Sequence, residues 1–167
     1  MINVNNIVLI GMPGAGKSTV GVILAKELGY QFVDADLLIQ QREGCLLKDI
    51  IERDGVDGFI AIENQVNASI QAERTVIATG GSVVYGKEAM EHLKKIATVI
   101  YLSLSYEELS TRLGNLKNRG VVLRDGQTLK DLYEERSVLY EKYADITIDE
   151  KNRDIEQTLQ CIIDKVS

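Results

Sequence analysis

The sequence predicts an α/β fold in which a parallel β-sheet is covered by helices on both faces. Short apolar runs alternate along the whole chain with segments of helical periodicity, and strands this apolar are typical of parallel sheets with right-handed crossover connections. The 167 residues are 45% hydrophobic and 26% charged and include a single proline, which fits one compact domain. We therefore expect one domain, residues 1–167, around one core.

Five short apolar runs are the predicted strands. They are NIVLI (6–10), YQFVD (30–34), TVIAT (75–79), TVIYLSL (98–104) and ITID (146–149). A helix follows the first strand, because apolar residues recur on one helical face from Val20 to Leu28. Gly29 comes directly after this stretch and is predicted to end the helix.

Two later segments are also predicted to be helical. Residues 57–71 have the core stripe Phe59, Ile62, Val66 and Ile70. Residues 128–143 have the apolar stripe Leu129, Leu132, Tyr133, Tyr140 and Tyr143. Arg136 lies in the middle of that second stripe. A buried charge without a partner costs on the order of several kcal/mol, so either an internal carboxylate or a ligand must meet this guanidinium.

Composition and charge argue against several classes of function. The formal charge of −6, without a run of Lys or Arg, disfavours binding to nucleic acid or to an anionic membrane surface. No apolar run approaches the roughly 20 residues of a spanning helix and MINVNN is unlike a signal peptide, so we expect a cytoplasmic protein. We also expect a monomer. Cys45 and Cys161 fit no metal spacing and are expected to be reduced thiols. With His92 as the only histidine, a zinc site or a Ser/His/Asp triad is poorly supported.

A phosphate-binding loop is predicted between the first strand and the first helix. IVLI-GMPGAGKST places Gly11, four further residues and then Gly16-Lys17-Ser18 there, which is the P-loop pattern in the context that it requires. The glycines let backbone N–H groups point inward, the helix N-terminus adds partial positive charge, and Lys17 reaches the outer phosphates. Ser18 is expected to ligate Mg²⁺. The alternative is a Gly-rich turn that only joins strand to helix.

Nucleotide binding alone does not define a reaction. The sequence lacks the Asp-x-x-Gly and Asn-Lys-x-Asp patterns of GTPases, and TVIAT and TVIYLSL end without the acid of a motor ATPase. The candidate acids are Asp34 and Asp36 at the carboxyl end of the second strand, the edge where open α/β sheets bind ligands. If the strand continues through both, one can order a metal-bound water and the other can accept a proton from a substrate hydroxyl. The alternative is an N-cap beside a solvated acid.

With these residues the chain resembles the shikimate kinase family, whose members transfer the γ-phosphoryl group of ATP to a ring hydroxyl of shikimate. The resemblance covers nearly the whole chain and rests on GMPGAGKST, VDAD, DGVDGFIAIE, ATGG, the segment around Arg119, ERSVLYEKYAD and the Arg153 segment. It implies a three-layer P-loop kinase fold with a five-stranded parallel sheet in the order 2-3-1-4-5, flanking helices and a lid loop. The product would be shikimate 3-phosphate, on the route to chorismate and the aromatic amino acids.

For the nucleotide, the resemblance implies a site for ATP and Mg²⁺ at Gly14, Ala15, Gly16, Lys17, Ser18 and Thr19. Asp34 would lie on the metal side of this site. Arg119 would sit on a lid of about 114–127 that closes over the phosphates, where it would neutralise charge together with Lys17. Arg112 and Arg153 would flank the adenine.

For the acceptor, the resemblance implies that Asp36 holds the substrate hydroxyl and that Gly80 and Gly81 bring backbone amides to the substrate. Arg136 would bind the substrate carboxylate. A planar guanidinium on an apolar wall suits bidentate capture of a carboxylate, because the apolar surroundings reduce competition from water. The alternative is a structural ion pair between Arg136 and an internal acid, either Asp36 or Glu63.

The chain departs from the family at Ile60, within the acceptor-binding segment of about 35–63. The family has an arginine there as a second contact to the carboxylate, and its loss also removes a partner of Glu63. Such an ion pair contributes about 1–3 kcal/mol, or about ten- to a hundredfold in affinity. Either Arg136 and backbone amides bind shikimate more weakly, or the cavity serves a less anionic acceptor, such as an amine-bearing polyol that Glu63 could meet. A third reading is that Ile60 only packs.

Two smaller departures concern the same region. Ser82 replaces a third glycine after ATGG, and Gly120 replaces the usual proline after the lid arginine. A freer lid adds on the order of 1 kcal/mol to the entropic cost of closing. Three functions therefore stay open: a shikimate kinase, a kinase for another small hydroxylated acceptor, and a nucleotide-binding module without catalysis. A module without catalysis would not need the residues that the chain retains, which are Lys17, Ser18, Asp34, Asp36, Arg119 and Arg136.

Overall fold

The computed structural model describes residues 5–114 and 125–166. Along the chain the elements are β1 (Asn6–Ile10), α1 (Lys17–Leu28), β2 (Gln31–Asp34), α2 (Ala35–Glu43), α3 (Leu47–Ala68), β3 (Thr75–Ala78), the 3₁₀ turn η1 (Val83–Tyr85), α4 (Lys87–Ile96), β4 (Thr98–Ser103), α5 (Tyr106–Gly114), α6 (Leu129–Tyr143), β5 (Ile146–Asp149) and α7 (Ile155–Val166). The strands form one sheet in the order β2-β3-β1-β4-β5, and every neighbouring pair is parallel. The predicted α/β class and the strand order are therefore confirmed.

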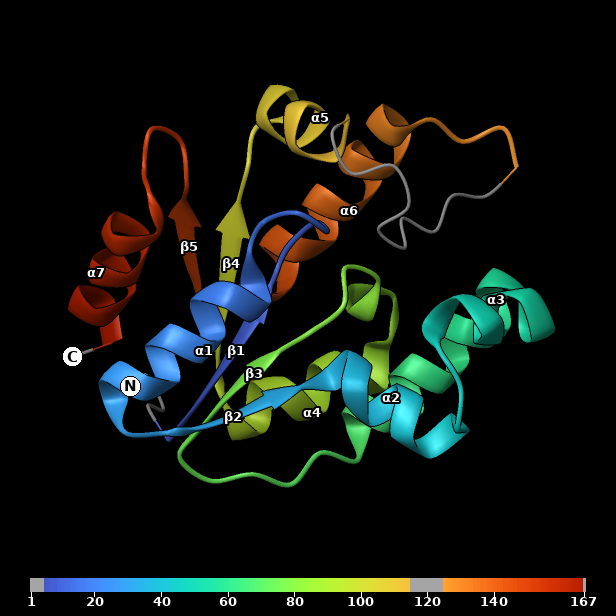
Figure 1. The fold of residues 1–167 in the computed structure, drawn as a ribbon, viewed down its shortest axis with the longest axis horizontal. Coiled ribbons are helices and arrows are strands. Elements are labelled where there is room, and N and C mark those ends of the chain that lie inside the picture. Colours follow the sequence, from blue (N-terminus) through green and yellow to red (C-terminus); the bar gives the residue numbers. More distant parts are fainter. Residues whose placement is uncertain (1–4, 115–124, 167) are drawn as a thin grey trace.

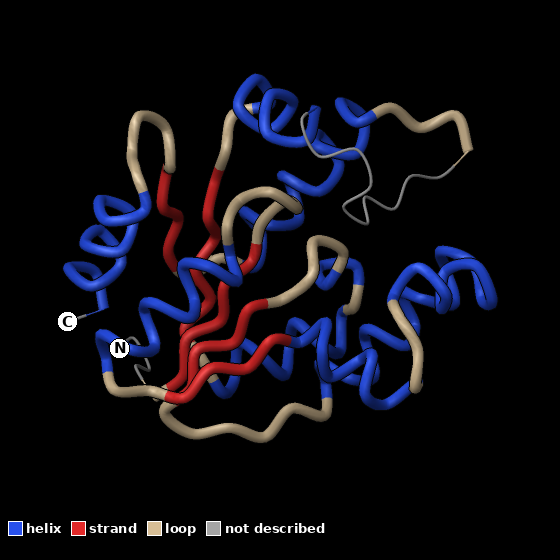
Figure 2. The backbone as a smooth tube through the Cα atoms, viewed as in Figure 1, coloured by secondary structure: helices blue, strands red, loops and turns tan. Residues whose placement is uncertain are grey.

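Helices cover both faces of the sheet and give three layers (Figures 1 and 2). α1 and α7 pack against each other on one face, whereas α4 and α6 pack against β4 on the other. β1 is the central strand, and Val8 pairs with Ile77 of β3 on one side and with Val99 of β4 on the other. Since all strands run in one direction, the carboxyl ends of β1, β2 and β3 meet at one edge, where parallel sheets bind ligands.

The first helix ends where the sequence predicts. Gly29 follows α1 in the left-handed region with φ 70°, and its N–H donates to the last-turn carbonyl group of Lys26. On the inner side of α1, Gly21 contacts the Phe32 ring, because a Cβ on Gly21 would lie 2.7 Å from that ring. α1 therefore packs closely against β2, and its N-terminus lies at the carboxyl edge of the sheet (Figure 1).

The predicted helix 57–71 is part of a longer element, α3, which is interrupted at one residue. Gly55 has φ 76° and ψ 178°, so a new helical segment begins after it and carries Phe59. This segment ends at Ala68, earlier than predicted, and Ile70 is buried beyond its end. α2 and α3 share a small apolar cluster of their own, made of Ile39, Ile50, Phe59 and Val66. The cluster packs α2 and α3 together beside the carboxyl edge of the sheet.

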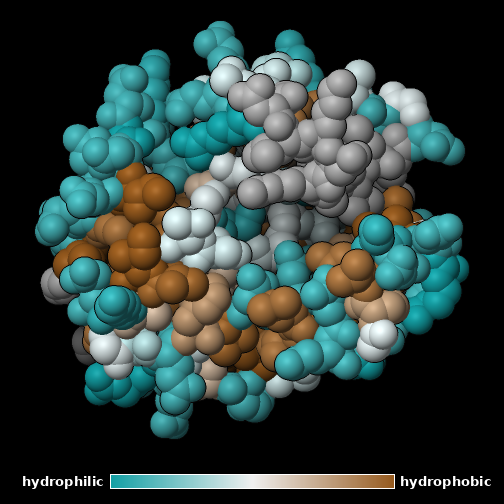
Figure 3. Space-filling model, in the orientation of Figure 1, coloured by the Kyte–Doolittle hydropathy of each residue, from teal (hydrophilic) through white to brown (hydrophobic). Residues whose placement is uncertain are grey.

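The surface is mostly hydrophilic in the view of Figure 3. Apolar side chains gather in smaller groups, one of them over α1 and α7, where Val22 and Ile155 are about half exposed. Among the described helices, none is long and apolar enough to cross a membrane.

Candidate functional site

The loop between β1 and α1 has the backbone geometry of a phosphate cradle. Gly14 and Gly16 have φ values of 91° and 82°, which glycine adopts without strain. Gly16 is also the N-cap of α1, and no side chain caps the first-turn N–H groups. Space in front of the loop is open, because no atom lies within 4 Å of a Cβ built on Gly16. The loop therefore fits a phosphate group at a helix N-terminus.

Lys17 is buried inside this loop. It is 8% exposed, and its Nζ donates to the carbonyl groups of Gly11 at 2.6 Å and Met12 at 3.0 Å. Burial lowers the pKa of Lys17 to about 8, and the Asp36 carboxylate opposes this shift. An incoming phosphate would add negative charge beside the ammonium, which favours its protonated form.

Ser18 and Asp34 place two oxygen ligands side by side next to the loop. The Ser18 hydroxyl donates to Asp34 Oδ2 at 3.1 Å, and Asp34 Oδ1 accepts from the Asp36 N–H at 2.9 Å. Asp34 is thus the N-cap of α2 as well as the last residue of β2. The condition that the strand continues through both acids is not met, because the capped helix begins at Ala35. The N-cap alternative is confirmed for Asp34.

These oxygens suit Mg²⁺ that is bound mainly by phosphates and water. Mg²⁺ prefers hard oxygen ligands and usually takes only one or two from the protein. Within residues 5–114 and 125–166, no group of three or more His, Cys, Asp or Glu side chains is placed to hold a metal. A hydroxyl and a single carboxylate beside a phosphate loop fit a metal ion that binds together with a nucleotide. They fit a metal ion held by protein ligands alone less well.

Asp36 offers a free carboxylate oxygen at the inner end of the site. Its Oδ1 is buried and has no hydrogen-bond partner among the described residues. Burial raises the pKa of Asp36, the Asp34 carboxylate raises it further, and Lys17 opposes both. Such a carboxylate is suited to accept a hydrogen bond, and then a proton, from a hydroxyl group placed against it.

A second cavity adjoins Asp36, and we call it the acceptor cavity. Its charged side chains are Asp36, Lys48, Glu63 and Arg136. Its remaining walls are Pro13, Leu47, Ile51, Phe59, Gly80, Gly81 and Ser82. The space in front of the phosphate loop, which we call the phosphate cavity, also reaches Asp36 and Lys48. The two cavities therefore meet at the carboxyl edge of the sheet.

Arg136 is a buried cation without a carboxylate partner. It is 2% exposed, it lies over the Tyr85 ring at 5.5 Å, and a Cβ on Gly81 would be 2.8 Å from its Nη1. It forms no ion pair with a described carboxylate and its Nε has no hydrogen-bond partner, while the guanidinium interacts with the hydroxyl groups of Tyr85 and Tyr140. The internal ion pair with Asp36 or Glu63 is thus not formed here, and the guanidinium is available to an anionic ligand.

Glu63 is a second buried acid in the acceptor cavity. Its Oε1 accepts a hydrogen bond from Ser82 at 2.5 Å, and its buried Oε2 has no partner among the described residues. Burial raises the pKa of Glu63 to about 7, and Ser82 opposes the shift. A Cβ on Gly80 would lie 2.7 Å from Glu63 Oε2 and 2.8 Å from Asp36 Oδ1, so the two free oxygens flank one glycine. This pair can accept hydrogen bonds from a ligand rich in hydroxyl groups.

Ile60 lies beside the acceptor cavity without lining it. Phe59 and Glu63 of α3 both line the cavity. Ile60 follows Phe59 directly on the helix and is half-buried. The cationic contact that the family resemblance implies at position 60 is therefore missing from this wall, and no other residue of α3 after Gly55 replaces it with a cation.

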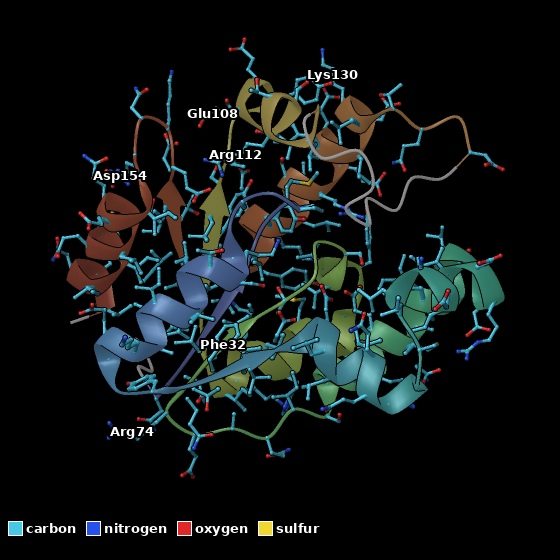
Figure 4. All side chains as sticks on the ribbon, in the orientation of Figure 1. Phe32, Arg74, Glu108, Arg112, Lys130 and Asp154 are labelled. Carbon is cyan, nitrogen blue, oxygen red and sulfur yellow. The ribbon has the colours of Figure 1, made fainter. Side chains whose placement is uncertain are left out.

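The two arginines assigned to the adenine side lie at the same end of the sheet. Arg112 of α5 donates to the Gly14 carbonyl group at 2.9 Å and lies 3.9 Å from the Glu150 carboxylate. Arg153 donates from its backbone N–H to the Glu150 carbonyl group. Figure 4 shows Glu108 and Arg112 in the upper part of the molecule, where Asp154 lies directly before α7. Burial raises the pKa of Glu150 to about 7, against the effect of Arg112.

Most of the predicted site residues converge on one edge of the sheet. Gly14, Ala15, Gly16, Lys17, Ser18, Thr19, Asp34, Asp36, Glu63, Gly80, Gly81 and Arg136 all lie on or beside the two cavities. Arg119 and Gly120 fall outside the described residues, as does most of the predicted lid. The sequence reasoning missed Leu47, Lys48 and Ile51, since nothing in their spacing distinguishes a cavity wall from an ordinary helix face.

Several proteins with similar sequences match this chain almost end to end. The family model for shikimate kinase matches residues 13–167. A shikimate kinase of Sulfurihydrogenibium sp. (strain YO3AOP1) is 36% identical over 162 residues, which cover 96% of this chain and 97% of that protein. A shikimate kinase of Haemophilus influenzae (strain PittEE) is 39% identical over 162 residues, which cover 93% and 89% of the two chains.

Solved structures give the same result. The shikimate kinase from Acinetobacter baumannii, solved in complex with shikimate, has a TM-score of 0.87 and 33% identity, covering 98% of this chain and 93% of that one. The shikimate kinase from Aquifex aeolicus vf5 has a TM-score of 0.79 and 30% identity, covering 96% and 95%.

Proposed function

Since the chain belongs to the shikimate kinase family, we propose that it transfers the γ-phosphoryl group of ATP to a hydroxyl group of shikimate, giving shikimate 3-phosphate. The observation that carries this proposal is the pair of adjoining cavities. One is a phosphate cradle with a buried lysine, and the other holds a buried guanidinium without a carboxylate partner and two carboxylate oxygens that accept no hydrogen bond from a described residue. ATP and an anionic polyhydroxy acceptor together match that distribution of charge.

The nucleotide phosphates are proposed to bind the loop N–H groups and the Lys17 ammonium. Ser18 and Asp34 would hold Mg²⁺, which screens phosphate charge when it is bound. Arg112 and Arg153 would flank the adenine, which is supported by their common location near Glu150. Arg119 would act on the phosphates as the family resemblance implies.

The acceptor is proposed to lie with its carboxylate on Arg136 and its reacting hydroxyl on Asp36. Gly80 and Gly81 line the same cavity, and their amides would complete the contacts. Asp36 would orient the hydroxyl and take its proton as the oxygen attacks the γ-phosphorus in line with the leaving ADP oxygen. The raised pKa of Asp36 supports this role, because it brings the carboxyl closer to the basicity that proton transfer near neutral pH requires. A monomeric, cytoplasmic protein remains part of the proposal and rests on the sequence alone.

The direct test is ADP release by the purified protein with Mg-ATP, with and without shikimate up to millimolar concentrations. Saturable turnover that depends on shikimate is expected, with Lys17→Met as the inactive reference that keeps the fold. ATP binding without any stimulation by shikimate would contradict the proposal.

A second candidate is a kinase for another small hydroxylated acceptor that carries an amine. It is favoured by the unpartnered Glu63 Oε2 and by the absence of a cation at Ile60. A panel of hydroxy acids, polyols and amino alcohols distinguishes the two candidates. This second function is excluded if shikimate alone is turned over efficiently, and it is supported if an amino alcohol has the highest kcat/KM.

A further inference from the structure

The two cavities share a boundary that carries one negative and one positive side chain. Six residues line both of them: Pro13, Asp36, Leu47, Lys48, Gly80 and Gly81. Of these six, Asp36 and Lys48 have ionisable side chains. A phosphoryl group that leaves a nucleotide in the phosphate cavity for a hydroxyl in the acceptor cavity has to cross this boundary. Both charges are therefore placed where the transferring group must pass.

Lys48 is free to bind a ligand there. It is exposed in the first turn of α3, and its ammonium has no hydrogen bond or ion pair with any other described residue. The other two cations of the cavities are placed differently. Lys17 is held by two loop carbonyl groups, and Arg136 lines the acceptor cavity but not the phosphate cavity. Within the described chain, Lys48 is the one cation that lines both.

We propose that Lys48 is a catalytic residue that binds the non-bridging oxygens of the γ-phosphoryl group while it moves from ATP to the acceptor. The proposal rests on the proposed function. The bond from the γ-phosphorus to the ADP oxygen breaks and the bond to the acceptor oxygen forms. The hydroxyl proton goes to Asp36, and the departing electron pair stays on ADP. Lys48 takes part by donating N–H groups to the charge that the three equatorial oxygens share.

The geometry favours the phosphoryl group over the acceptor carboxylate as the ligand of Lys48. Arg136 lines the acceptor cavity and not the phosphate cavity, so a carboxylate held by this guanidinium lies in the acceptor cavity, whereas Lys48 lines both cavities. Asp36, whose carboxylate is proposed to take the reacting hydroxyl, also lines both cavities. A lysine ammonium is a compact charge on a flexible stem, and it suits a group that moves between two cavities.

The test compares Lys48→Met with Lys48→Arg and with a control, Lys95→Met. Lys95 is exposed on α4 and lines neither cavity, so its replacement makes the same chemical change elsewhere. In Lys48→Met we expect kcat to fall about tenfold or more, in line with the loss of one donor to transition-state charge, while the KM values for ATP and shikimate change little. Lys48→Arg should retain more activity than Lys48→Met, and Lys95→Met should match the wild type.

A binding measurement keeps this test separate from the test of the proposed function. ADP with aluminium fluoride mimics the planar phosphoryl group and can be titrated calorimetrically without an acceptor. Lys48→Met should weaken its binding by a factor similar to the loss in kcat and leave the binding of ADP alone unchanged. The proposal is overturned if binding of the mimic is unchanged, if kcat is unchanged, or if only the KM for shikimate rises, which would assign Lys48 to the carboxylate. If the wild type turns over no shikimate, the proposed function is rejected. The titration with ADP and aluminium fluoride then tests by itself whether Lys48 binds the phosphoryl group.

Discussion

At Asp36, burial and a neighbouring negative charge act in the same direction. Both raise the pKa of this carboxyl group, and its buried Oδ1 is left without a partner among the described residues. Folding normally avoids an unsatisfied buried oxygen, since leaving one unpaired costs on the order of 1–3 kcal/mol. The arrangement is understandable if a ligand hydroxyl completes the site, because the cost is then recovered when the ligand binds.

Replacing Asp36 by Asn tests this interpretation with almost no change of shape. We expect kcat to fall by about 10²- to 10⁴-fold, because the amide cannot accept the hydroxyl proton. The free energy of unfolding should not decrease, since a buried charge has been removed. Steady-state kinetics and urea denaturation measure the two effects, with Glu91→Gln on the exposed face of α4 as the control. Near-normal turnover in Asp36→Asn would remove the proposed role.

Glu63 should make the stability of the protein depend on pH around neutrality. Its pKa is about 7 in the folded protein, against 4.5 as its ordinary value, because it is buried. Between these values the folded chain binds more protons at this site than the unfolded chain does, so the free energy of unfolding falls as the pH rises from about 4.5 to 7. The loss is on the order of 3 kcal/mol. Asp36 has a raised pKa as well and acts in the same direction.

The measurement is urea denaturation at pH 5 and pH 8 of the wild type and Glu63→Gln. The glutamine can keep the hydrogen bond from Ser82 and has no charge to bury. The wild type should lose more stability than the variant on going to the higher pH. Equal losses in the two proteins would show that Glu63 titrates normally, and would remove the pH dependence assigned to it.

At the scale of elements, the break in α3 allows both of its segments to line the acceptor cavity. Before Gly55, α3 supplies Leu47, Lys48 and Ile51 to the cavity; after it, the same element supplies Phe59 and Glu63. A continuous straight helix would carry these two groups of residues along one axis. The change of direction at a single glycine lets one element contribute to the cavity from both of its segments.

Gly55→Ala should disturb the acceptor cavity more than the phosphate cavity. With φ 76° and ψ 178°, this backbone conformation is essentially restricted to glycine, and an alanine there costs about 1–3 kcal/mol. We expect a corresponding loss in the free energy of unfolding and a larger rise in KM for shikimate than for ATP. Glu52→Ala, at an exposed helical position just before the break, should change stability by less than about 0.5 kcal/mol. Unchanged stability in Gly55→Ala would mean that the break has no steric basis.

α6 places Arg136 through contacts at both of its ends. Thr128 and Asp131 form a capping box at the start, and Tyr140 donates to the Gly81 carbonyl group at 2.6 Å. The helix is thus fixed against the turn that carries Gly80 and Gly81. A buried guanidinium held in this way loses little further entropy when it binds a carboxylate, which favours tight binding.

For the whole molecule, the features that could be predicted are those that short sequence patterns determine. The strands follow from short apolar runs, the end of α1 follows from Gly29, and the phosphate loop follows from its glycines and Lys17. The order of the strands came from the resemblance to a family, because no local pattern states which strands become neighbours. The strands, the end of α1 and the strand order were confirmed, with end shifts of a few residues.

The parts that could not be predicted depend on contacts between distant segments. The hydrogen bond from Ser82 to Glu63 joins residues that are 19 positions apart. The place of Lys48 at the boundary of two cavities depends on how α3 meets the phosphate loop. The capped helix start after Asp34 was open to two interpretations, since the sequence does not fix whether a short strand continues or a helix begins.

The central claim is that this fold presents a carboxylate-binding guanidinium, Arg136, beside a phosphate-transfer site. The most direct measurement is the ratio of kcat/KM for shikimate to that for its methyl ester in the unmodified protein. The ester keeps the ring hydroxyls and loses the negative charge, so no variant has to fold. Loss of one charge-assisted contact predicts a preference for shikimate of about ten- to a hundredfold. Equal values for the acid and the ester would show that the carboxylate is not bound by a cation, and would contradict the account.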